Sequence, residues 1–160
     1  MSTTEKVSAA DLASLPLFAG VATADLEGLA AASTRRGLSD GETLVEMGQP
    51  ISEIHWLVAG QLALRVRYEN RWVLVSTLHA GDMLGWSALR EDPKALSTTR
   101  AIGPAVMVSM PVTGLLGLLT GGSAQSELLL RRLFGIATHH LDESRAQLLQ
   151  LGREGVISAG

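Results

Sequence analysis

A seven-residue run decides the fold class of this chain: Leu62-Ala63-Leu64-Arg65-Val66-Arg67-Tyr68. Apolar residues occupy every second position, which is the period of a β-strand with one face in a core. The two arginines fall on the other face. Together with Arg71 they are either a small basic patch or the solvated face of a strand. The run predicts a half-buried strand.

Turn signals recur on both sides of this run, and short apolar stretches lie between most of them. The turn signals are 39–41, 47–50, 59–60, 69–70, 80–82 and 103–104. Many short strands at this spacing predict an antiparallel β-sandwich or jelly-roll over residues 35–110. The chain is therefore expected to be mainly β, with helices on both sides, at 11–33 and 112–152.

The N-terminal helical segment has two expected parts. Asp11 is placed to cap a short turn that Pro16 closes. Thr23 then precedes an Ala/Leu segment with acidic residues in its first turn, where they suit the positive end of a helix. We expect this segment to cover the core.

The C-terminal segment contains a break at 121–123, after which Ser123 or Ser126 can cap a long helix. This helix carries an a/d heptad whose steps alternate between four and three residues. The members are Leu130, Phe134, Ala137, Leu141, Ser144, Leu148 and Leu151. The series spans about 32 Å of helix. It is either the seam of a parallel homodimer or an intramolecular stripe that packs on the β-roll, and the small residues favour the dimer.

Composition excludes several classes of protein. The chain has 160 residues, no cysteine and a formal charge of −3, so it fits one domain, residues 1–160, without disulfides or thiolate metal sites. Mild acidity argues against a nucleic-acid-coating surface. No signal peptide and no apolar run long enough to span a membrane are present, so we expect a soluble, cytoplasmic protein with no membrane partner.

Catalytic and metal signatures are missing from the sequence. His55 and His79 stand alone, and His139 and His140 are adjacent on the helix and are expected to face different ways. No nucleophile elbow, Walker motif, dinucleotide fingerprint or carboxylate pair is found. We expect neither an enzyme nor a metal site, and name no catalytic residue and no certain cofactor.

The order of these parts resembles the cyclic-nucleotide-binding domain of the catabolite-activator and Fnr type of regulator. The resemblance runs from about residue 14 to 152. It is carried by 15–21, 41–44 with Gly48, 54–60 and 78–85. It implies an eight-stranded β-roll, N-terminal helices and a long dimerising helix. The missing cysteines exclude an Fnr-like iron–sulfur sensor within this family.

The family holds its ligand in a phosphate-binding cassette after the Gly-Asp turn, which the resemblance places at residues 85–101. A glycine starts a short helix, a glutamate accepts a bond from the ribose hydroxyl, and an arginine forms a fork on the phosphate. The ligand contacts expected here are Gly85, Trp86, Ser87, Ala88, Leu89, Lys94, Ser97 and Thr98.

Both charged positions of the cassette depart from the family pattern. The glutamate aligns with Trp86, whose indole accepts no hydrogen bond. The arginine aligns with Ala95, and a one-residue shift offers Lys94 as a point charge. Trp86 then fills the ribose space, stacks on another ligand, or is a core or cap residue of a vestigial pocket. Two lost charge-assisted bonds correspond to about 3–6 kcal/mol, or roughly 10²- to 10⁴-fold in affinity.

The sequence therefore predicts a ligand-sensing regulatory domain with a degenerate cassette. It would bind a nucleotide-like or other small molecule, with cAMP or cGMP bound weakly, and would signal through a dimer helix. The alternatives are a ligand-free dimeric interaction module and a truncated transcription regulator. Only residues 152–160 follow the dimer helix, too few for a helix-turn-helix, so this chain alone is not expected to bind DNA.

Overall fold

The computed structural model describes residues 4–153, with side chains described through residue 150. The chain divides into two compact units, Met1–Gly117 and Leu118–Gly160, and each is described by itself. The elements of the first unit are β1 (Thr4–Lys6), α1 (Ala9–Ala13), the 3-10 helix η1 (Pro16–Phe18), α2 (Thr23–Ala32), β2 (Thr34–Leu38), β3 (Thr43–Val45), β4 (Glu53–Tyr68), β5 (Arg71–His79), β6 (Met83–Leu84), the 3-10 helix η2 (Trp86–Leu89) and β7 (Thr98–Pro111). Helix α3 (Val112–Thr120) crosses into the second unit, which contains α4 (Ala124–Arg153).

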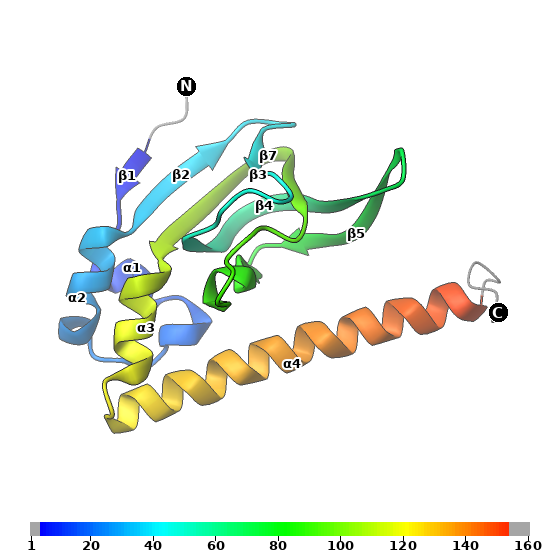
Figure 1. Cartoon of the computed structure of the whole chain (residues 1–160). Coiled ribbons are helices and arrows are strands. Elements are labelled where there is room, and N and C mark those ends of the chain that lie inside the picture. Colours follow the sequence, from blue (N-terminus) through cyan, green and yellow to red (C-terminus); the bar gives the residue numbers. More distant parts are fainter. Residues whose placement is uncertain (1–3, 154–160) are drawn as a thin grey trace. The chain divides into compact units, whose positions relative to one another are not determined.

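The strands form one antiparallel sheet in the order β1-β2-β7-β4-β5, with β3 paired to β7 and β6 paired to β4 (Figure 1). This open sheet with flanking helices confirms the predicted mainly-β, jelly-roll class. The quoted run lies in β4, where Leu62 is buried while Arg65 and Arg67 are exposed. The predicted alternation holds from Leu64 to Arg67, whereas Ala63 on the arginine side is buried and Tyr68 on the apolar side is exposed.

The described residues hold seven strands, whereas the family resemblance implies eight. Strands β4 and β7 are each continuous, and their pairing shifts register on both sides of Ala59. Gly60 has φ +88, and a Cβ atom there would lie 2.4 Å from the carbonyl oxygen of Pro104. Only glycine fits this crossing, since it has no Cβ and tolerates positive φ.

The core of the roll is a cluster of aliphatic side chains on the inner faces of the strands. Its members are Leu38, Leu57, Leu62, Leu78, Leu84, Ala101, Ala105 and Met107. A continuous apolar cluster of this kind holds the strands in one register, because a one-residue slip would turn each strand's apolar face outward. It also supports β6, which leads directly into the cassette.

The N-terminal helices form where predicted, but their ends differ in detail. Ser8, not Asp11, is the N-cap of α1, and the two residues form a capping box in which Ser8 N donates to Asp11 Oδ2 at 2.8 Å. The hydrogen bonds from Ser8 lower the pKa of the Asp11 carboxyl. Pro16 opens η1 rather than closing a turn, since proline suits the first turn of a helix.

In the second unit, Ser123 caps α4 by accepting a hydrogen bond from Ser126 N at 3.1 Å, which decides between the two serines predicted for this role. Thirty residues make a helix of about 45 Å. On the heptad series, Leu130 and Leu141 are exposed, Phe134 is 72% exposed and Leu148 is 57% exposed. Leu151 belongs to the helix, but its side chain lies outside the described residues.

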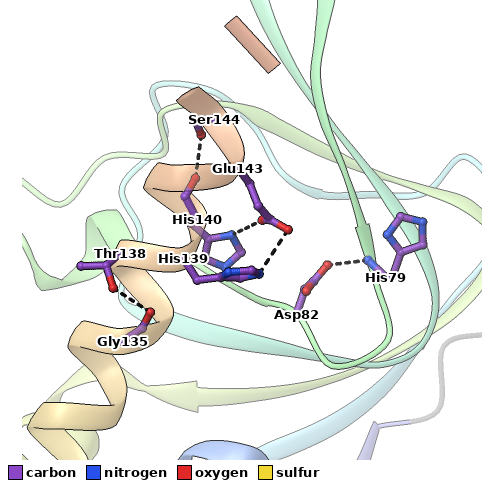
Figure 2. Close-up of polar contacts among 8 residues, drawn as sticks. All are labelled: His79, Asp82, Gly135, Thr138, His139, His140, Glu143 and Ser144. Carbon is purple, nitrogen blue, oxygen red and sulfur yellow. Dashed lines mark hydrogen bonds and ion pairs between the residues drawn. The ribbon is translucent and has the colours of Figure 1, made fainter. Parts of the chain in front are cut away.

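The adjacent histidines of α4 differ in exposure, at 72% for the side chain of His139 and 26% for that of His140, yet both contact the same acid. His139 Nε2 lies 3.3 Å from Glu143 Oε1, and His140 Nδ1 lies 3.4 Å from Glu143 Oε2 (Figure 2). One carboxylate has two oxygens, and its flexible side chain sits three and four positions on, within reach of both rings. The pair therefore converges on a single acid.

Candidate functional site

The cassette begins after a tight turn between β5 and β6. Asp82 Oδ2 accepts a hydrogen bond from His79 N at 2.8 Å, which closes the turn on itself (Figure 2). Leu57, in the first third of β4, exchanges two backbone hydrogen bonds with this turn, donating to Asp82 O at 2.9 Å and accepting from Gly81 N at 2.8 Å. The turn is therefore held against the sheet, and the chain leaves it in a defined direction.

Gly85 starts the short helix of the cassette in the left-handed region, with φ +95. A Cβ atom on this residue would lie 2.7 Å from the carbonyl oxygen of Glu53 and 3.2 Å from Cα of Ile54. Both backbone conformation and space therefore require glycine. Helix η2 follows, with Ser87 and Ala88 buried.

The other predicted contacts of the cassette differ in exposure. Trp86, Leu89, Ser97 and Thr98 are half-buried. Ala95 is buried, while its neighbour Leu96 is 60% exposed. Lys94 is 57% exposed and forms an ion pair with Asp92, its Nζ lying 3.2 Å from Asp92 Oδ2. The residues predicted at the ligand thus form one loop and one short helix, but their side chains share no common charged centre.

A second segment, residues 47–51, fastens the cassette loop. Gly48 N donates to Ala95 O at 2.8 Å, Ala95 N donates to Gln49 O at 2.9 Å, and Ile51 N donates to Pro93 O at 2.9 Å. Met47 N donates to Thr98 Oγ1 at 3.0 Å. Thr98 therefore already accepts a backbone hydrogen bond, and its hydroxyl keeps its proton for another acceptor.

The roll also contains a buried histidine, His55, to which the sequence analysis assigned no role. His55 of β4 is 4% exposed, and its Nδ1 lies 2.7 Å from Ser109 Oγ of β7. Burial, aided by the positive charge of Arg36, lowers the pKa of His55 to about 4. The imidazole is neutral at pH 7. His55 and Ser109 also line a cavity of about 430 Å³.

The described residues contain no group of three or more His, Cys, Asp or Glu side chains arranged to hold a metal ion. None of their helices combines the length and apolarity that crossing a membrane requires.

The roll and the short helix after its Gly-Asp turn have the architecture of a cyclic nucleotide-binding domain. The model of the cyclic nucleotide-binding domain family matches residues 35–121, which is more than half of the chain. The chain belongs to this family. No curated protein sequence matches it.

Solved structures show the same fold at low sequence identity. A cyclic nucleotide-binding domain from Methylobacillus flagellatus superposes with a TM-score of 0.77 and 15% identity, over 93% of this chain and 88% of that chain. The sensor domain of the transcriptional regulator DNR from Pseudomonas aeruginosa superposes with a TM-score of 0.65 and 20% identity, over 78% of this chain and 88% of that chain. The catabolite activator protein of Thermus thermophilus superposes with a TM-score of 0.66 and 17% identity, over 86% of this chain and 63% of that chain.

Proposed function

We propose that this chain is a cytoplasmic, ligand-sensing regulatory domain whose cassette has lost the charged contacts of a tight cyclic-nucleotide site. It takes a nucleotide-like or other small molecule at the cassette and passes occupancy to a partner copy through α4. The observation that carries the proposal is the side-chain chemistry of an otherwise intact cassette. Gly85 and the buried face of η2 are present. The sequence resemblance aligns Trp86 and Ala95 with the family's charged contacts.

Lys94 supports the loss of a phosphate fork. Its ammonium is paired with Asp92 and exposed, so moving it toward a ligand would break that pair and order a flexible side chain. A single ammonium also offers no bidentate geometry. We infer that cAMP and cGMP lose about 3–6 kcal/mol relative to a cassette with both charged contacts.

Trp86 supports a ligand of a different kind. Its half-buried indole has a flat apolar face, which suits stacking on an aromatic ring or filling space where a ribose would sit. Ser97 and Thr98 add hydroxyl groups to the same loop. We propose that the ligand is held by stacking and hydroxyl contacts more than by charge.

The exposed heptad of α4 supports the dimer. Four large apolar side chains of the series are exposed in the described chain, and Ala137 and Ser144 between them allow a second helix to approach closely. Pairing of two such helices gives each ligand site a route to its partner. No step of the proposal requires catalysis by this chain.

A thermal-shift screen against nucleotides, second messengers and haem tests the proposal. A ligand of the cassette should raise the Tm of the wild-type protein, and Trp86→Ala should abolish that rise. Trp72→Ala, at an exposed tryptophan of β5, is the matched control and should keep it. If no compound raises the Tm at millimolar concentration, the ligand-free dimeric interaction module is the better account. A truncated transcription regulator would show the same ligand response. Sequencing of the full genomic reading frame tests this alternative, because it shows whether a DNA-binding domain is encoded with this chain.

A further inference from the structure

The cavity beside His55 is built by neighbouring strands in register. Thr34 of β2 pairs with Ser109 of β7, and Ser109 pairs with His55 of β4, so the three side chains form a row across one face of the sheet. All three line the cavity. None of the residues that line it belongs to the cassette at 85–101. This is a separate pocket in the same compact unit.

One ring nitrogen of His55 faces this cavity without a partner. Nδ1 is engaged by Ser109 Oγ, and no hydrogen bond of Nε2 is found among the described residues. No fully inaccessible side-chain nitrogen or oxygen in the described residues lacks a partner, so Nε2 must retain contact with solvent. Because the rest of His55 is buried and lines the cavity, that contact is made through the cavity. A ligand that enters the cavity can replace this solvent contact with a hydrogen bond to Nε2.

The charges around the cavity select the ligand. Arg36 lines it, and its Nη2 lies 3.5 Å from Oε1 of Glu42 in an ion pair. Glu46 and Glu53 also line the cavity, and Glu53 shares the face of β4 that carries His55 because the two are two positions apart. Among the lining side chains, the two carboxylates of Glu46 and Glu53 outnumber the one guanidinium of Arg36, so the lining as a whole carries negative charge. A phosphate or carboxylate is disfavoured there.

We propose that this cavity is a second ligand site that takes a small primary amine, whose ammonium donates to Nε2 of His55 beside the carboxylate of Glu53. For Nε2 to accept this bond, Nδ1 carries the proton and donates to Ser109 Oγ. The leucine, valine and isoleucine of the lining, at 44, 45 and 51, contact the short alkyl part of the amine. The site is independent of the ligand proposed for the cassette.

Nuclear magnetic resonance of the full chain at pH 7 tests this assignment, with n-butylamine as the probe. 1-Butanol is the matched uncharged control, and acetate and inorganic phosphate are the anionic controls. We expect butylamine to shift the His55 ring resonances saturably and to leave Nε2 with the nitrogen shift of an unprotonated imidazole. Glu53→Gln should weaken the affinity for butylamine by roughly 2- to 5-fold. Glu91→Gln, at an exposed glutamate outside the cavity, should not.

Each other outcome overturns the proposal. If butanol shifts the His55 ring resonances as much as butylamine does, the charge of the amine has no role in binding. If acetate or phosphate shifts them, the cavity is an anion site with a protonated Nε2. An absence of saturable shift with every probe leaves the cavity filled with water alone. Glu53→Gln keeps the His55–Ser109 hydrogen bond, so an unchanged Tm shows that a loss of binding is not a loss of fold.

Discussion

His55 Nδ1 lies 2.7 Å from Ser109 Oγ, so two residues 54 positions apart in the chain share a buried hydrogen bond between β4 and β7. The bond satisfies Nδ1 of an imidazole whose residue is only 4% exposed. It joins the two longest strands of the roll at one row of the sheet. The pair therefore links the stability of the fold to the protonation state of one histidine.

Acid should destabilise the fold through His55. Its pKa is about 6.5 in the unfolded chain and about 4 in the folded protein, so the unfolded chain binds the proton more readily between these values. The contribution of His55 to stability is complete above pH 6.5 and falls as the pH drops toward 4, by about 3 kcal/mol in total. Urea unfolding at a series of pH values measures this slope.

His55→Gln should remove that slope between pH 6.5 and 4, because the amide does not titrate. His79→Gln, at an exposed histidine, is the control and should keep it. Equal slopes in the wild type and in His55→Gln would show that other groups carry the acid sensitivity.

Gly85→Ala should destabilise the protein by roughly 1–3 kcal/mol, because a Cβ atom adds strain at positive φ and collides with the backbone of β4. The matched control is Gly81→Ala. Gly81 has φ +101 but no atom within 4 Å of its Cβ position, so its variant carries only the conformational strain. The difference in unfolding free energy between the two variants measures the collision at Glu53. Equal losses would mean that Gly85 is required for its φ alone.

Leu141→Asp should dissociate the proposed dimer, because it places a charge in the middle of the apolar seam. Light scattering should give 33.8 kDa for the wild type, twice the 16.9 kDa of one chain, and 16.9 kDa for the variant. Leu149→Asp changes an equally apolar, exposed residue outside the heptad series and should remain dimeric. A wild type that is monomeric at working concentration, or equal dissociation by both variants, contradicts the seam.

Local patterns predicted the elements well because their causes are local. The alternation at 62–68 follows from the pleat of one strand, and Ser123 caps α4 through a residue three positions away. The α1 cap was misplaced because Ser8 and Asp11 are both good capping residues, and only the reciprocal bonds of the capping box decide between them.

Long-range features of the sites were beyond such patterns. The fastening of Ala95 by residues 48 and 49, and the pairing of His55 with Ser109, depend on how β4, β7 and the loops meet in space. An isolated histidine in a strand has no spacing signal that names its partner. The convergence of His139 and His140 on Glu143 was missed for a different reason, because side-chain flexibility overrides the angle between neighbouring helix positions.

Calorimetric titration with cAMP and with cGMP tests the central claim, a cassette without the charged contacts for a cyclic nucleotide. The loss of two charge-assisted bonds predicts a dissociation constant on the order of 1 mM or weaker for both ligands. Weak or absent heat up to millimolar ligand is the expected result. Saturable binding of either nucleotide at micromolar concentration would contradict the account, because Trp86, Lys94 and the rest of the cassette would then replace the family's contacts in full.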